Sequence, residues 1–236
     1  MHYKFSKTVV IALGGSIVHP DGIDVHFLKD FKKFLTPFLK RGIKFVLVIG
    51  GGKLARNFQE AAKQVSNKVT DEDKDWIGIH ATRLNAHLLR TIFRDVADPV
   101  VIDIRGKIKK IRRPVTVASG WRPGWSTDYV AMRIAADFGV GAAIIAGKPA
   151  HVYSKDNTKH ADAVPFHELS WREYRKLIPA KWKPGLHAPV DPVGAALGAR
   201  ESVKAIIIDG RNLPNFRALL NGKEFNGTII GARKDK

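Results

Sequence analysis

Three glycine-bearing turns constrain the fold of this chain more than any other feature of its sequence. They lie at residues 13–16, 50–53 and 120–128, and each follows an apolar, strand-like run. The second and third turns lead directly into patterns with helical spacing. A turn between a strand and a helix directs backbone N–H groups and the positive end of a helix dipole at one point, which suits an anion. Glycine lets the backbone approach that anion closely because it has no Cβ atom.

Strand-like and helix-like segments alternate along the whole chain. The expected strands cover residues 8–13, 44–49, 99–102, 115–118, 141–146, 204–208 and, as a final edge strand, 227–230. The expected helices cover residues 25–40, 53–65, 70–94, 126–138, 171–177, 191–199 and 213–220, and residues 153–189 are otherwise rich in loops. Short apolar runs between turn signals are typical of buried parallel strands. The alternation therefore predicts an α/β fold with a mostly parallel central sheet.

The three turns are expected to converge on one crevice. All of them follow strands, and ligands of open α/β sheets bind at the carboxyl ends of the strands. A polyphosphate needs several backbone donors and mobile cations. Lys53 and Arg56 could supply the charge, although Arg56 alone also suits an ordinary surface position. The backbone donors would be Gly14, Gly15, Gly51 and Gly52, and a plain tight turn is the alternative for the first pair.

The third turn combines aromatic, cationic and hydroxyl side chains. Trp121 and Trp125 either cover a base or sugar or simply close the core. Ser126 and Thr127, with the neighbouring amides, could hold a monophosphate, and Ser126 could equally be only a helix N-cap. Arg122 adds a planar cation suited to phosphate. The turn therefore predicts a second anion site beside the first two turns.

The charge balance favours anionic partners. Lys and Arg number 40 against 22 Asp and Glu, a net charge of +18, and the alternative is a solvated basic surface screened by salt. Residues 105–113 carry six cations and no acid. We expect a solvated hairpin or a lysine-guarded edge strand there rather than a nucleic-acid surface, because no aromatic residues are interleaved.

Several classes of protein are excluded by what the sequence lacks. Cysteine is absent, so neither disulfides nor cysteine-based sites are available. The sequence contains neither an 18-residue apolar run nor an N-terminal apolar stretch like that of a signal peptide, so we expect a cytoplasmic protein without a membrane span. The histidines lack the close spacing of helical metal sites, and the Gly-x-Ser-x-Gly motif of serine hydrolases is missing.

The order of the motifs resembles that of the amino acid kinase superfamily, and within it the uridylate kinases, especially the archaeal type. The resemblance covers nearly all of the chain, and its most specific part lies in residues 75–79 and 82–86. The matching stretches are residues 14–16, 50–56, 75–79, 82–86, 124–128, 152–153, 191–192 and 226–228. The resemblance implies a three-layer α/β/α sandwich over residues 1–236. Within that single domain, residues 1–140 would form the acceptor-binding half and residues 141–236 the ATP-binding half.

The resemblance also implies roles for individual residues. UMP would be held by Gly51, Asp75, Trp121, Arg122, Pro123, Gly124, Trp125, Ser126 and Thr127, with Asp75 bonding the nucleoside. ATP would be held by Gly14, Gly15, Gly52, Arg56, Gly147, Lys148, Tyr153 and Asp156. Catalysis would depend on Gly15, Ser16, Lys53 and Asp128. Mg²⁺ would enter with the ATP phosphates, without protein ligands, and the chain would assemble as a homo-oligomer, typically a hexamer.

Three departures from the family pattern cluster on the ATP side. Ala12 occupies a position that is lysine in many relatives, residues 146–151 replace a Thr-Asn-Val-Asp pattern, and residues 193–197 contain no lysine. The expected reaction is in-line phosphoryl transfer from ATP to UMP, which depends on positioning and charge neutralisation. Two alternatives stay open: a diverged kinase with another acceptor, and a catalytically weak nucleotide-binding or regulatory protein.

Overall fold

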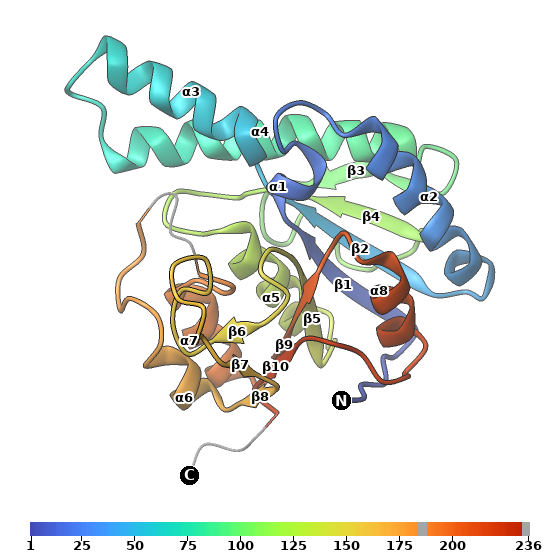
Figure 1. Cartoon of the computed structure of the whole chain (residues 1–236). Coiled ribbons are helices and arrows are strands. Elements are labelled where there is room, and N and C mark those ends of the chain that lie inside the picture. The colour runs from blue at the N-terminus through green and yellow to red at the C-terminus, as the bar shows by residue number, and fades with distance from the viewer. Residues whose placement is uncertain (184–187, 233–236) are drawn as a thin grey trace.

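Helices cover both faces of one large sheet in this protein (Figure 1). The structure, a computed structural model, describes residues 1–183 and 188–232. Residues 184–187 and 233–236 of the expected domain lie outside the described residues. The helices are α1 (Gly15–Val18), α2 (Val25–Lys40), α3 (Gly52–Val65), α4 (Asp71–Ile92), α5 (Thr127–Asp137), α6 (Trp171–Arg175), α7 (Pro192–Glu201) and α8 (Leu213–Leu220).

The central sheet is mostly parallel, as predicted. Its strands are β1 (Thr8–Leu13), β2 (Lys44–Ile49), β3 (Ala97–Ile102), β4 (Val115–Ala118), β5 (Ala142–Gly147), β8 (Glu168–Leu169), β9 (Lys204–Asp209) and β10 (Thr228–Ile230). Their order is β3-β4-β2-β1-β5-β9-β10-β8, and only the β9–β10 pair is antiparallel. The short strands β6 (Val152–Tyr153) and β7 (Pro165–Phe166) form a separate antiparallel pair. Parallel strands place their carboxyl ends along one edge, where ligands bind.

The alternation of side chains along β1 divides the core into two layers. Val9, Ile11 and Leu13 belong to a cluster with apolar residues of α2, α4 and α8. Val10 and Ala12 belong to a second cluster with residues of α5, α6 and α7. Successive strand residues point to opposite faces, so a strand buried on both faces needs a continuous apolar run. This arrangement gives the three-layer α/β/α sandwich that the sequence predicts.

Phenylalanine at helical spacing explains why α2 forms and how it docks. Phe27, Phe31, Phe34 and Phe38 are buried on one face of this helix, and Asp24 caps its N-terminus by accepting from Phe27 N at 2.9 Å. Neighbouring rings along the stripe lie 5.6 to 6.0 Å apart, within the range of favourable aromatic contacts. The helix continues past Pro37 to Lys40.

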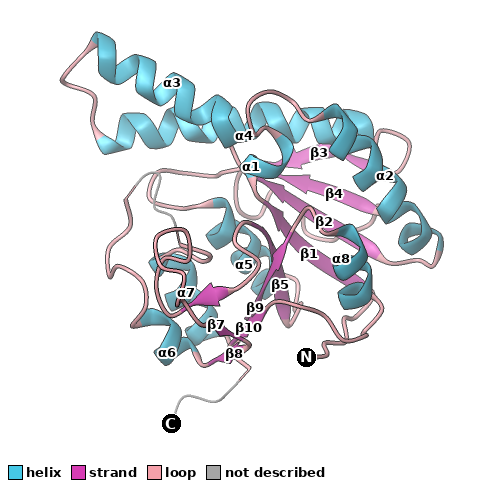
Figure 2. Cartoon of the chain, in the orientation of Figure 1, coloured by secondary structure: helices cyan, strands magenta, loops and turns pink. Residues whose placement is uncertain are grey.

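Two details of the predicted strands are wrong. The strand expected at residues 227–230 is not an edge, because β10 lies between β9 and the two-residue strand β8. Residues 105–113 form turns and bends rather than a hairpin or edge strand, and most of them are exposed. Figure 2 shows how much of the chain between β5 and α6 is loop, with β6, β7 and β8 as short interruptions. Two-residue strands are too short to give a periodic pattern.

A helical arm extends beyond the sheet. It is built from α3 and the N-terminal half of α4, which run side by side away from the strands (Figure 1). A capping box starts α4, because Thr70 and Asp73 satisfy each other's backbone N–H groups. In the described part of the chain, no helix combines the length and apolar character needed to cross a membrane.

Candidate active site

The first two glycine turns pack backbone against backbone. A Cβ atom built on Gly15 would lie 2.6 Å from Gly52 Cα and 2.7 Å from Gly50 C, closer than a real Cβ is found. Gly50 N donates to Leu13 O at 3.0 Å, which joins the ends of β1 and β2. Gly52 has a φ of +65°, a conformation that favours glycine. The glycines are therefore needed for the two turns to meet.

Helix α4 joins these two turns to the third. The buried Asn85 donates from Nδ2 to Gly50 O at 2.9 Å and to Gly51 O at 3.2 Å. One helical turn earlier, the Thr82 hydroxyl accepts from Gly120 N at 2.8 Å. Two polar side chains of one helix thus fix the carboxyl ends of β2 and β4. The convergence expected from the sequence is present, and α4 provides the connection.

Asp75 holds the tip of the third turn. Its Oδ2 accepts from Gly124 N at 2.7 Å and from Trp182 Nε1 at 3.3 Å. Asp75 Oδ1 forms no hydrogen bond with a residue in the described ranges. Trp182 was not among the predicted site residues, because it lies in a loop-rich segment that carries no motif.

The two tryptophans of the third turn lie in different environments, one in the core and one nearer the surface. The Trp121 side chain is buried and donates from Nε1 to Ile102 O at 3.2 Å, so it closes the core, which is the simpler of the two expectations. Trp125 is half-buried, with the Arg122 guanidinium 4.8 Å above its ring. Its ring also lies 4.5 Å from that of Tyr129. The Arg122–Trp125 stack is the part of the turn that faces outward.

Ser126 joins the third turn to α7 through Asp191. As the N-cap of α5, Ser126 Oγ accepts from Asp128 N at 3.1 Å and from Tyr129 N at 3.0 Å. Its hydroxyl donates to Asp191 Oδ2 in a short hydrogen bond. Asp191 caps α7 in turn, with Oδ1 accepting from Val193 N and Gly194 N. The N-termini of two helices are therefore tied together at this point. The Asp-Pro pair was part of the motif, but the link to Ser126 could not be inferred from it.

Asp128 is a carboxyl group without a cationic partner. Burial raises its pKa to about 8, and the negative charge of Asp191 adds to the effect. Asp128 forms no ion pair within the described residues. Neither the buried Ala12 nor any of residues 193–197 carries a cation. Asp128 is therefore protonated over most of the neutral range.

We expect Asp128→Asn to flatten the pH dependence of stability between about pH 4 and pH 8. The folded protein holds a proton on Asp128 that the unfolded chain releases near its ordinary pKa of 3.8, so stability is fully present below that pH and falls as pH rises toward 8. The amide of the variant does not titrate. Thermal melts of both proteins at intervals across this range measure the difference, and parallel curves would contradict the expectation.

The predicted cations lie at the outer side of the first two turns. Lys53 Nζ pairs with Asp21 Oδ1 at 2.6 Å, and this contact is the main reason that the pKa of Asp21 is lowered. Arg56 is exposed and adds to the same effect. Arg211, which was not predicted, donates from Nη2 to Asp24 Oδ2 at 2.8 Å and to Ile17 O at 3.3 Å. A cationic rim thus surrounds α1, the short helix that contains Ser16.

The predicted ATP-side residues fall into two groups. Gly14 N donates to Ala146 O at 2.8 Å, which places the end of β5 and Gly147 beside the first turn. Tyr153 and Asp156 lie in and after β6, and no hydrogen bond or ring contact among the described residues links them to the glycine turns. Lys148 is exposed at the end of β5. Gly210 packs against Ala146. It directly follows strand β9, just as the predicted glycines follow their strands, so the same sequence pattern could have identified it.

The donor set of the site suits Mg²⁺ better than a softer metal. The hard donors in this region are the carboxyl oxygens of Asp128 and Asp191, and Mg²⁺ prefers oxygen ligands. Both oxygens of Asp191 are engaged in capping and in the bond from Ser126. Within the described ranges, no group of three or more His, Cys, Asp or Glu side chains is arranged to hold a metal ion. This arrangement is compatible with a cation that arrives on the phosphates of a nucleotide.

Comparison with known proteins gives matches over nearly the whole chain. Residues 7–209 match the model of the amino acid kinase family. The chain is 34% identical over 227 residues to a protein named uridylate kinase from Methanocorpusculum labreanum, covering 94% of this chain and 95% of that protein. It is 31% identical to another from Pyrobaculum neutrophilum, covering 94% and 98%.

Solved structures give the same result for the fold. The structure of uridylate kinase from Archaeoglobus fulgidus matches with a TM-score of 0.72 at 27% identity, over 94% of this chain and 99% of that one. The structure of UMP kinase from Bacillus anthracis matches with a TM-score of 0.75 at 17% identity, over 97% and 96%. The second likeness concerns the fold alone.

Proposed function

Because this chain belongs to the amino acid kinase family, we propose that it transfers the γ-phosphoryl group of ATP to UMP, giving ADP and UDP. The observation that carries the proposal is the junction of three glycine turns at the carboxyl ends of β1, β2 and β4, fixed by Asn85, Thr82 and Asp75 of α4. The similar proteins named uridylate kinase supply the substrate class.

The first two turns would hold the ATP phosphates. No side chain caps the N-terminus of α3, a helix of 14 residues, so its dipole and N–H groups face the turns. Gly14, Gly15 and Gly52 would contribute by letting the first two turns and the end of β5 pack closely beside this helix end. Lys53 and Arg56 at the rim would neutralise charge, with Lys53 exchanging Asp21 for the nucleotide.

The third turn would hold UMP. Asp75 Oδ1 would bond a ribose hydroxyl, while Asp75 Oδ2 keeps its hydrogen bond from Gly124 N. Arg122 and the hydroxyl of Thr127 would face the acceptor phosphate. Catalysis by such a site is positioning plus charge neutralisation, with the UMP phosphate in line with the bond that breaks. Mg²⁺ bound to the ATP phosphates would supply further neutralising charge.

The division into an acceptor half (residues 1–140) and an ATP half (residues 141–236) is also part of the proposal. It is supported by the contacts of Asp75 with Gly124 and of Thr82 with Gly120, which lie within the first half, whereas the contact of Asp75 with Trp182 crosses between the halves. Gly147 contributes to the first turn from the second half. A cytoplasmic location is a prediction from the sequence.

A coupled ADP-release assay with ATP, Mg²⁺ and a panel of nucleoside monophosphates tests the proposal. We expect turnover with UMP at a kcat/KM well above that with AMP, GMP or CMP. Turnover with a different acceptor would favour the diverged kinase. Tight UMP binding without ADP formation would support the second alternative, a catalytically weak nucleotide-binding or regulatory protein.

We also propose that the chain forms a homo-oligomer through the helical arm. Phe58 and Val65 of α3 are 63% and 89% exposed, and Trp76 and Leu84 of α4 are also exposed. Exposed apolar residues gathered on adjacent helices mark contact surfaces. A hexamer, as the resemblance implies, would need this surface and others.

We expect Phe58→Glu to dissociate this assembly. A carboxylate in an apolar interface loses its hydration without gaining a partner. Val25→Glu, at a 56% exposed site at the start of α2, serves as the control. Light scattering coupled to size-exclusion chromatography gives the mass of each protein. A wild-type monomer, or an unchanged mass for Phe58→Glu, would contradict the proposal.

A further inference from the structure

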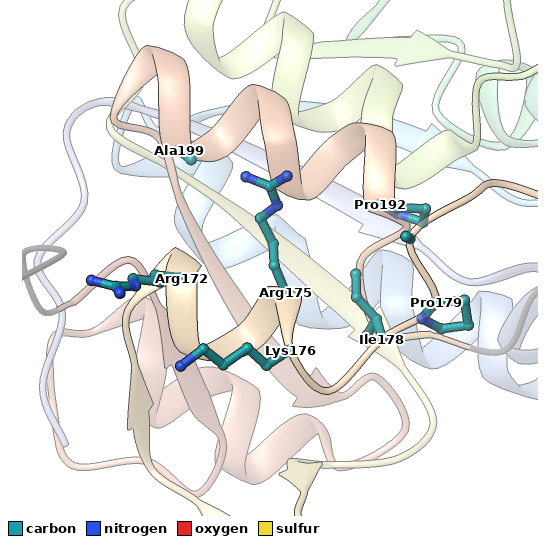
Figure 3. A pocket seen from close by; sticks show the side chains of 8 residues that line it. Arg172, Arg175, Lys176, Ile178, Pro179, Pro192 and Ala199 are labelled. Carbon is teal, nitrogen blue, oxygen red and sulfur yellow. The ribbon is translucent and has the colours of Figure 1, made fainter.

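A pocket between α6 and α7 carries chemistry that phosphoryl transfer does not use. Its volume is about 410 Å³, within the usual range for small-molecule sites. Figure 3 shows Arg172 and Arg175 of α6, with Lys176 at the C-terminal cap of that helix, on one side and Pro192 of α7 on the other. It is separate from the three glycine turns, none of which contributes to its lining.

The cations of this pocket lie on one face of a short helix. Arg172, Arg175 and Lys176 are spaced i, i+3 and i+4, all three are exposed, and the lining contains no acidic side chain. A helix dipole favours cations in the last turn. Arg175 and Lys176 form no ion pair with any residue in the described ranges. An anion in the pocket would gain charge-assisted contacts from these two side chains.

The remaining wall is apolar. Ile178, Pro179 and Pro192 line it, and neither proline offers a backbone donor. Cations opposite an apolar wall suit a compact anion, or one attached to a ring, better than an extended nucleic-acid backbone. Guanidinium and ammonium groups together are typical phosphate ligands.

Two short connections lead from this pocket to the acceptor side of the transfer site. Tyr174, in α6, exchanges hydrogen bonds of 2.7 and 2.8 Å with the backbone of Val190, next to the Asp191 that binds Ser126. The pocket wall also includes Ala180, two residues before the Trp182 that donates to Asp75. A ligand that fixes this wall would therefore stabilise the two contacts that hold the third turn, Ser126 with Asp191 and Trp182 with Asp75.

We propose that this pocket binds a polyphosphate anion, either free or as part of a nucleotide, and that its occupancy stabilises the third turn. The binding is independent of the transfer reaction, whereas the effect on the third turn rests on the proposed function.

The test is calorimetric titration with inorganic tripolyphosphate at low salt. Wild-type protein should bind two equivalents per chain, one at the glycine turns and one in this pocket. The double variant Arg175→Ala/Lys176→Ala should bind one, with the pocket affinity reduced at least roughly tenfold, since charge-assisted hydrogen bonds are lost. The charge-matched control is Lys29→Ala/Lys33→Ala, which removes two exposed cations of α2 and should behave as wild type.

Equal isotherms for the two double variants would overturn the proposal. All four substitutions are at exposed positions, and unchanged thermal melts would show that the fold is kept. Titration with purine and pyrimidine nucleoside triphosphates separates the sources: affinity equal to that of tripolyphosphate assigns the site to free polyphosphate, and tighter binding assigns it to a nucleotide. This readout does not need turnover, so it distinguishes failure of this proposal from failure of the proposed reaction.

Discussion

Gly15→Ala is expected to reduce phosphoryl transfer by at least roughly 100-fold, the loss that follows when reacting groups are displaced by about 1 Å. The added Cβ would lie 2.6 Å from Gly52 Cα and 2.7 Å from Gly50 C. These are backbone atoms, so neither can move without carrying a whole turn with it. Gly15 starts α1 and does not have a positive φ, so the effect is steric rather than conformational.

Overpacking at this position should also lower stability, by about 1–3 kcal/mol. The control is Gly22→Ala, because a Cβ at Gly22 would meet nothing within 4 Å. That variant should keep wild-type activity and stability. ADP release, thermal melting and UMP binding are measured for both. A Gly15→Ala protein that keeps its fold and UMP binding but loses turnover would support the proposed ATP-side role. Full activity of this variant would show that Gly15 is not part of the active site.

Asp75→Ala should weaken UMP binding by at least roughly tenfold, and by about 100-fold if both its contacts and a ligand bond are lost. Gly124 N and Trp182 Nε1 would lose their shared acceptor, and the third turn would lose its link to α4 at this point. ATP binding should change little, since the first two turns are held by other groups.

Asp75→Asn separates the two roles of this side chain. Its amide oxygen can still accept from Gly124 N, so the turn should stay in place while the negative charge toward UMP is lost. The KM for UMP should then rise with a smaller change in kcat. Glu72→Gln, an exposed acid three residues earlier on α4, is the matched control and should leave both constants unchanged. An unaltered KM for UMP in Asp75→Ala would show that Asp75 does not contribute to the acceptor site.

Much of the fold follows from local patterns. The continuous apolar run of β1 requires a strand covered on both faces, and the phenylalanine spacing of α2 requires a helix with one buried side. The position of β10 could not be predicted in the same way. Its status as interior or edge depends on β8, whose two residues carry no periodic signal and come from a distant part of the chain.

The sequence by itself determined where the backbone could form these closely packed turns. Glycine at a strand end is a local property, since only the missing Cβ permits the close approach of Gly15 to Gly52. Tertiary structure alone decided which groups support those turns. The bond from Trp182 to Asp75 spans 107 residues and that from Ser126 to Asp191 spans 65. Such pairs form because the fold brings separate loops to the same edge of the sheet. The spacing of these residues along the chain does not indicate that they are in contact.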